Sequence, residues 1–310
     1  MMTKLSDEVR ISMLNPPTGR VRVILDTDTF NEIDDQFAIV QALLSPDRIG
    51  LEAIYAAPFT NSRSQSPGHG MELSYDEILR LLARLGKDPK DFVFKGVTDY
   101  VGPAKLGHSS AAVDDLISRA KTASTQSPLY VIAIGAISNI ASALLKAPEI
   151  IEKIVVVWLG GHALEWPHTK EFNLRQDVGG AQVLFDSGVS LVLVPAMGVT
   201  SHLHSNVPEI ERYVQPHGDI GEFLAMRFKE YSDVHIGWSK QIWDMAAIGW
   251  VLNSQWAPSV LMPTPVLTDS VTWSVDRSRH LMRYVTQVNR DLIFRDFFEK
   301  LAVHSNIKIN

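Results

Sequence analysis

The chain has 310 residues, 45% of them hydrophobic, which is enough to bury a sizeable core in one large α/β domain or two smaller domains. Its 29 basic and 35 acidic residues include no lysine- or arginine-rich block, so nucleic-acid binding has little electrostatic support. The lack of cysteine excludes disulfides, thiolate metal ligands and cysteine nucleophiles. No apolar run is long enough to cross a membrane, so we expect no membrane partner and a cytoplasmic location.

Short apolar segments alternate with amphipathic segments from residue 21 onward. The apolar segments predict strands at 21–26, 51–56, 92–95, 129–134, 154–159 and 191–194. Helical patterns separate them, including 34–44, a helix that begins at the capping-box sequence 74–77, and a helix after Ser138. Strands that alternate with helices predict right-handed βαβ units around a mostly parallel sheet.

The pattern becomes mainly helical after about Pro208. The predicted helices there are 209–214, 220–231, 240–251 and 291–303. Because no repeat or linker interrupts the chain, we predict a single α/β domain over 21–310, with a mostly parallel central sheet flanked by helices and a largely helical C-terminal part. Residues 1–20 form a predicted loosely held N-terminal arm. The Ser-, Pro- and Gly-containing segment 60–71 predicts a mobile loop, either a cover for a site or a plain surface loop.

Four aspartates lie within ten residues at the end of the first predicted strand: Asp26, Asp28, Asp34 and Asp35. Two unit charges ~4 Å apart repel by ~4 kcal/mol at an effective dielectric constant near ~20. A divalent cation relieves such repulsion, and oxygen ligands without cysteine favour calcium or magnesium over zinc. Helix capping is the alternative explanation, but it accounts for Asp34 and Asp35 and not for the other two.

These residues resemble the opening motif of the inosine/uridine-preferring nucleoside hydrolase family. The motif here is DTDTFNEIDDQFAIV, with a turn between the aspartates two residues longer than in the best-known members. Four further segments are similar to the family and follow in its order: VIAIGAISNIASALLKAPEI, IVVVWLGGHA, EFNLRQDVGGAQVLF and WDMAAIGWVL. The resemblance spans about residues 21 to 252. It implies hydrolysis of the N-glycosidic bond of a ribonucleoside, giving free base and ribose.

The resemblance also assigns a role to each motif residue. Asp28 would be the general base that activates a metal-bound water. Calcium, the implied cofactor, would be bound by Asp28, Asp35, Asp244 and the backbone carbonyl of Ile134. Contacts to the ribose would come from Asp34, Asn61, Glu171 and Asn173. Asp26 would shape the loop. The family also implies a homodimer or homotetramer with a small-molecule ribonucleoside substrate and a place in nucleoside salvage.

The residue types suit this reaction independently of the resemblance. Cleavage of an N-ribosidic bond creates positive charge on the sugar, and carboxylates stabilise that charge. Ribose itself carries no charge, so its recognition depends on hydrogen bonds, which carboxylates and an asparagine amide can make to vicinal hydroxyls.

One position departs from the family pattern. Many members carry a histidine before the late aspartate as the acid for the departing base, and this chain has Trp243. A general acid typically contributes ~10²–10⁴-fold to the rate. Three interpretations stay open: Trp243 stacks on the base, another group such as His162 or His235 donates the proton, or the leaving group needs no acid. His162 follows a Gly-Gly pair at a strand end and is predicted to contact substrate. A purely structural, core role for Trp243 is a further alternative.

The sequence also allows two functions other than nucleoside hydrolysis. A haloacid dehalogenase-like phosphatase would use Asp26 as nucleophile and Asp28 as acid, although Phe30 stands where that class has Thr or Val. A ribonucleoside-binding protein would keep the metal site and lack catalysis.

Overall fold

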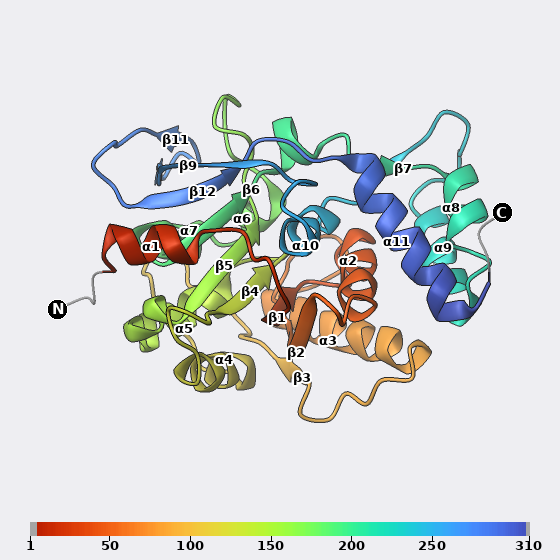
Figure 1. Ribbon diagram of the computed structural model, residues 1–310, viewed down its shortest axis with the longest axis horizontal. Coiled ribbons are helices and arrows are strands. Elements are labelled where there is room, and N and C mark those ends of the chain that lie inside the picture. The colour runs from red at the N-terminus through yellow and green to blue at the C-terminus, as the bar shows by residue number, and fades with distance from the viewer. Residues whose placement is uncertain (1–4, 308–310) are drawn as a thin grey trace.

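The computed structural model describes residues 5–307 and is built around one eight-stranded sheet (Figure 1). The strands are β1 (Val21–Thr27), β2 (Ile49–Ala56), β3 (Val93–Lys95), β4 (Leu129–Ala133), β5 (Ile154–Leu159), β6 (Ser190–Val194), β9 (Ser259–Pro263) and β12 (Leu281–Val285). Their order in the sheet is β3-β2-β1-β4-β5-β6-β12-β9. All neighbours pair in parallel except β12 and β9, which are antiparallel.

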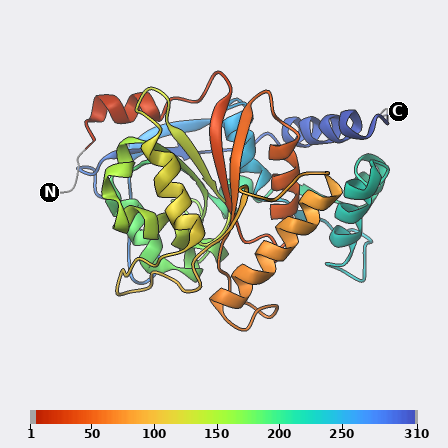
Figure 2. The ribbon, with the colours of Figure 1, turned by 90° about the horizontal axis from the view of Figure 1, so that it is seen from below.

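Helices cover both faces of the sheet because its central strands are apolar on both sides. On β1, Val23 and Leu25 enter one core, whereas Ile24 enters the other. The first core also receives side chains from α1 (Asp7–Met13), α2 (Asp34–Leu43), α3 (Pro67–Arg84), α8 (Val207–Tyr213), α9 (Gly218–Lys229), α10 (Met245–Leu252) and α11 (Arg290–Ser305). The second core receives side chains from α4 (Ala111–Lys121), α5 (Ser138–Lys146), α6 (Phe172–Gln176) and α7 (Val178–Ser187). Figure 2 shows the strands running between α4 and α5 on one side and α2 and α3 on the other.

Short elements complete the structure at the edges. They are the 3-10 turn Pro148–Glu152, the π-helical turn Ala196–Thr200, the antiparallel pair β7 (His204–Ser205) and β8 (Lys240–Gln241), and the pair β10 (Val266–Leu267) and β11 (Trp273–Ser274). Within residues 5–307, no helix is both long enough and apolar enough to span a membrane.

The predicted α/β class, with a mostly parallel sheet flanked by helices, is confirmed. Two details of the C-terminal part differ from the prediction. The segment 259–285 supplies β9 and β12 to the main sheet, although it was expected to belong to a mainly helical region. The helix predicted at 240–251 begins only at Met245, because residues 240 and 241 pair with β7.

The described part of the N-terminal arm is not loosely held, as the sequence had suggested. Ser6 caps α1 by accepting a hydrogen bond from the backbone N–H of Val9. Met13 and Leu14 are buried in the first core, and the buried Arg10 donates to the carbonyl of Gly188. Residues 1–4 lie outside the described residues. A boundary between an arm and a domain at residue 20 remains a prediction.

The helix α3 begins earlier than the capping-box sequence at 74–77 had indicated. Ser66 is its N-cap and accepts a hydrogen bond from the backbone N–H of His69 at 3.2 Å, with Pro67 in the first turn. Ser74 instead lies inside the helix and is fully buried, and its hydroxyl has no hydrogen-bond partner among residues 5–307. Part of the predicted loop 60–71 is therefore helical.

We expect the substitution Ser66→Ala to lower the free energy of unfolding by about 1 kcal/mol, because it removes the cap. Ser74→Ala should not lower it, since that change removes a buried hydroxyl without a partner and introduces a better helix former. Urea denaturation of both variants measures the difference. The reverse ranking would place the start of the helix at Ser74.

Candidate active site

A cavity of about 280 Å³ opens at the carboxyl ends of the central strands. Four of its lining residues lie at strand ends: Asp28 directly after β1, Ile134 directly after β4, Leu159 at the end of β5, and Ala196 two residues after β6. Asp244, immediately before α10, lines the same cavity although it lies far from these residues in the sequence. A parallel sheet brings these strand ends together, which is where α/β proteins bind ligands.

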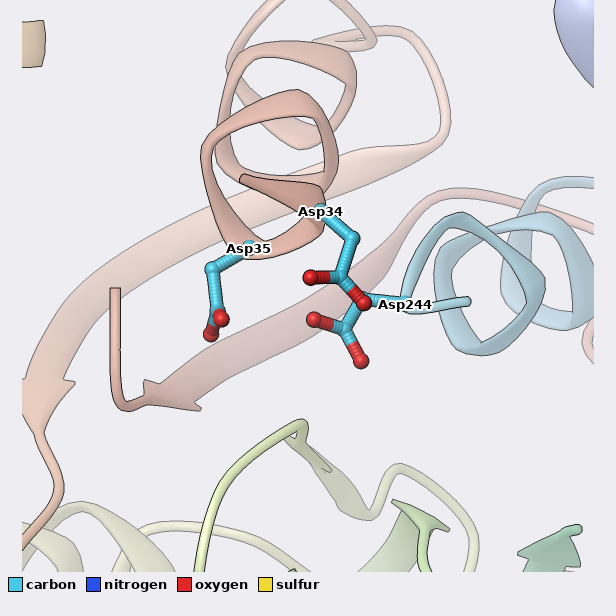
Figure 3. A group of neighbouring side chains, drawn as sticks. All are labelled: Asp34, Asp35 and Asp244. Carbon is cyan, nitrogen blue, oxygen red and sulfur yellow. The ribbon is translucent and has the colours of Figure 1, made fainter. Parts of the chain in front are cut away.

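Three carboxylates converge at one edge of this cavity (Figure 3). Asp34 and Asp35 lie on the first turn of α2, and Asp244 comes from the chain just before α10. One oxygen from each lies within 4.8 Å of the others, and all three side chains are buried. Asp28 lines the same cavity. Thus the structure brings together the predicted carboxylate ligands Asp28, Asp35 and Asp244, and Asp34 belongs to the same cluster.

Burial makes this cluster electrostatically costly. Burial, together with the charges of its neighbours, raises the pKa of Asp28 and Asp244 well above the ordinary aspartate value. Burial followed by the charge of Asp34 does the same for the pKa of Asp35. The pKa of Asp34 rises to about 7, through burial and then the charge of Glu32. A divalent cation would relieve this repulsion and restore the ionised forms.

The hydrogen bonds leave oxygens free for such a cation. Both side-chain oxygens of Asp28 and one of Asp34 are buried without a hydrogen-bond partner in residues 5–307. By contrast, Asp35 accepts a hydrogen bond from the hydroxyl of Thr27. Buried carboxylate oxygens without partners are unfavourable unless a ligand satisfies them. The residues therefore fit a hard divalent cation, which prefers carboxylate and carbonyl oxygens.

The carbonyl predicted as a neutral metal ligand faces this cavity but already has one partner. The side-chain amide of Asn173 donates to the carbonyl of Ile134 at 3.2 Å and to that of Leu159 at 3.1 Å. A carbonyl oxygen has a second lone pair, so the bond does not prevent Ile134 from coordinating a cation. It does fix Asn173: with both amide hydrogens donated, only its oxygen is left, as an acceptor for a substrate hydroxyl.

Glu171 is held rigidly at the N-terminus of α6. One of its carboxylate oxygens accepts from the backbone N–H of Asn173 at 2.8 Å, and the other from Gly161 and Leu174 at 2.9 and 3.0 Å. Burial raises the pKa of Glu171 to about 7, although these N–H groups lower it. Gly161 makes its contact with φ of +71°, where a Cβ would lie 2.5 Å from the hydroxyl of Thr169, so glycine is required there.

His162 and Trp243 line the cavity as predicted, whereas Asn61 does not. The ring of His162 is buried, and its Nδ1 accepts from the backbone N–H of Met197 at 3.4 Å, which places the ring proton on Nε2. Burial, followed by the proximity of His168, lowers the pKa of His162 to about 4. Asn61 is half-buried, and its side-chain amide donates to the side chain of Asn31 at 2.7 Å. Asn31 itself lines the cavity.

Several residues of this site were not predicted from the sequence. Asn31 and Glu32 lie in the turn that is longer than in the best-known family members, and both line the cavity. Lys240 reaches Glu32 with an Nζ–Oε2 distance of 2.5 Å. The unusual length of the turn was the feature of the sequence that could have indicated a role for Glu32. Nothing in the local sequence indicated Lys240, since its partner is distant in the chain.

Comparison with known proteins identifies the family. The model of the inosine-uridine preferring nucleoside hydrolase family matches residues 23–295. The chain belongs to this family. It is 27% identical over 266 residues to a pyrimidine-specific ribonucleoside hydrolase of Salmonella paratyphi B, covering 75% of this chain and 80% of the relative. A Citrobacter koseri protein of the same description is 24% identical over 261 residues, with the same coverage.

Solved structures show the same fold. A purine-preferring ribonucleoside hydrolase from Gardnerella vaginalis superposes with a TM-score of 0.72 at 21% identity, over 93% of this chain and 100% of that one. An inosine-guanosine nucleoside hydrolase superposes with a TM-score of 0.71 at 16% identity, over 93% and 99% of the two chains. Membership of the nucleoside hydrolase family, and not the fold alone, makes this protein an N-glycosyl hydrolase that acts on ribonucleosides. The phosphatase alternative is therefore wrong.

The raised carboxylate pKa values predict how stability depends on pH when chelator is present. Asp34 and Glu171 titrate near 7 in the folded protein, against 3.8 and 4.5 as ordinary values. Between about pH 4 and pH 7 the folded state therefore holds protons that the unfolded state has released, and stability falls as pH rises through this window.

Calcium should reduce the loss of stability with rising pH, because the carboxylates stay ionised around a bound cation. Urea denaturation at several pH values, with chelator and with calcium, measures the free energy of unfolding under both conditions. Parallel curves under the two conditions would contradict a cation site among these carboxylates.

Proposed function

We propose that this nucleoside hydrolase requires calcium and that Asp28 is its general base. The observation that carries the proposal is the buried Asp28 carboxylate, whose two oxygens have no partner in residues 5–307 and which lines the same cavity as Asp34, Asp35 and Asp244. The cation would be held by Asp28, Asp35, Asp244 and the carbonyl of Ile134. It would supply positive charge that orients water and lowers the pKa of that water.

The ribose would lie on the floor of the cavity, between the carboxylates and α6. Asp34, Glu171 and the side-chain oxygen of Asn173 are acceptors, so each suits a hydroxyl that donates. Their positions are preorganised, since backbone N–H groups hold Glu171 and two carbonyls hold Asn173. Asn61 would act indirectly by orienting Asn31.

In the reaction, Asp28 would take a proton from water as the oxygen attacks the anomeric carbon. The bond between that carbon and the base nitrogen breaks, and its electron pair leaves with the base. Positive charge develops on the sugar during this step. The surrounding carboxylates stabilise that charge more than they stabilise the neutral substrate, which is the condition for a faster reaction.

Departure of the base would involve Trp243 and His162, which both line the cavity. The half-buried indole of Trp243 offers a flat surface for stacking. His162 is neutral at pH 7 because its pKa is lowered to about 4, and its Nε2 is left as a hydrogen-bond donor. His235, the other histidine considered, is not among the lining residues, and its Nε2 lies 3.2 Å from the carbonyl of Lys229.

Base preference is tested by a panel of purine and pyrimidine ribonucleosides, since relatives of both descriptions exist. We expect base release from at least one substrate in calcium and its loss in excess chelator, restored when calcium is added back. Equal release under both conditions would contradict calcium dependence. We also propose that the protein is a cytoplasmic homo-oligomer that acts in nucleoside salvage. Size-exclusion chromatography with light scattering measures its oligomeric state.

Asp28→Asn should lower kcat by roughly 10²–10⁴-fold, the usual contribution of a general base. Asp244→Ala should act mainly through the cation, so that its loss of activity is partly recovered at high calcium. Steady-state kinetics at several calcium concentrations measures both, with the exposed Asp99→Asn as the control. A near-normal kcat for Asp28→Asn would overturn its assignment as the base.

Trp243→Phe should be milder than Trp243→Ala if the indole stacks on the base, because phenylalanine keeps an aromatic face. The difference should appear in kcat/KM for nucleosides and not in the thermal stability of the protein. Equal losses in the two variants, accompanied by a lower melting temperature, would assign Trp243 a structural role.

A further inference from the structure

A lysine side chain lies largely buried beside the carboxylate cluster. The side chain of Lys240 is 14% exposed, and its Nζ lies 2.5 Å from the carboxylate of Glu32 and 5.3 Å from the centre of the Tyr231 ring. Burial would lower the pKa of Lys240, but the charges of Asp34 and Glu32 outweigh it and raise that pKa. A charged lysine at this depth is costly unless it is paired, and Glu32 supplies the partner.

The ion pair joins the two segments that carry the cluster. Glu32 lies in the turn two positions before Asp34, and Lys240 lies in β8 four positions before Asp244. Oxygens of Asp34 and Asp244 are within 4.8 Å of each other. Within residues 5–307, this is the only ion pair between the turn at 29–33 and the segment 240–244.

Each segment is fixed to a different part of the protein on its other side. In the turn, the N–H of Asn31 donates to the carbonyl of Asp28 at 2.7 Å. Beyond Lys240, β8 pairs with β7, and the N–H of Ile242 donates to the carbonyl of Leu203 at 2.8 Å. The Glu32–Lys240 pair links these two segments directly.

We propose that Glu32 and Lys240 form a positioning pair, which holds the turn at 29–33 and the first turn of α2 against the segment 240–244. The pair so sets the separation of the Asp35 and Asp244 carboxylates, the proposed ligands of one divalent cation. This inference rests on the proposed metal site. Glu32 lines the cavity, but the role proposed for the pair is to act through the two aspartates.

Electrostatics and positioning make opposite predictions for the loss of Lys240. As a nearby positive charge, Lys240 repels a divalent cation, and its removal also leaves Glu32 as an unpaired negative charge. On charge alone, Lys240→Met should therefore bind calcium more tightly. If the pair positions the carboxylates, the same substitution weakens calcium binding by about tenfold or more, as is typical for residues that orient metal ligands.

The experiment is calorimetric titration of calcium into the full-length, metal-free protein. We expect weaker binding by Lys240→Met and binding closer to the wild type by Lys240→Arg, which keeps a charged donor for Glu32. Glu32→Gln should also weaken binding, but it should add little when Lys240 is already methionine. Lys240→Gln carries the same expected sign and replaces Lys240→Met if that variant does not fold.

The matched control is Lys95→Met, which breaks an ion pair of the same 2.5 Å length, to Glu72, outside the cavity. It should leave calcium affinity unchanged. Unchanged or tighter calcium binding by Lys240→Met overturns the positioning pair and leaves the metal site intact. A wild-type protein that binds no calcium overturns the metal site itself, and the positioning pair with it.

Discussion

The concentration of acidic side chains in a buried cavity is the constraint around which this protein is organised. Asp28, Asp34, Asp35 and Asp244 are all buried, and their charges oppose one another. Repulsion of this kind persists in a native structure only where the fold forces the groups together. Here the end of β1, the first turn of α2 and the start of α10 provide that force.

The sheet supplies rigidity on one side of the cluster, and side chains supply it on the other. Asp28 directly follows a central strand that is paired on both sides, by β2 and β4. Asp26, two residues earlier, accepts from the side-chain amide of Asn139 at 2.7 Å, which ties the strand end to α5. The carboxylates from α2 and α10 approach this fixed point, and α10 packs directly against α2.

Local patterns predicted the strands and the strand-end site because each pattern lies within a few residues. Apolar runs identified β1 through β6, and the family motifs identified the cavity-lining residues that we propose bind metal or ribose. Contacts between distant segments were not predictable in this way. Lys240 is paired to Glu32 by the tertiary fold. The short sequence LMRYV of β12, which Arg283 interrupts, gave no clear local signal. Asn61 was predicted from a loosely matching segment. It does not line the cavity but donates a hydrogen bond to Asn31, which does.

The position of β12 bears on the order in which the chain folds. This strand lies between β6 and β9, and its Arg283 donates to the carbonyl of Leu14 at 2.7 Å. Helix α1 packs against it, so the docking surface of α1 is complete only after residues 281–285 have been made. Contacts so distant in sequence slow folding and leave apolar surface exposed meanwhile. During synthesis, part of the apolar surface of α1 therefore stays exposed until β12 is made, and a chain truncated before β12 leaves that part uncovered.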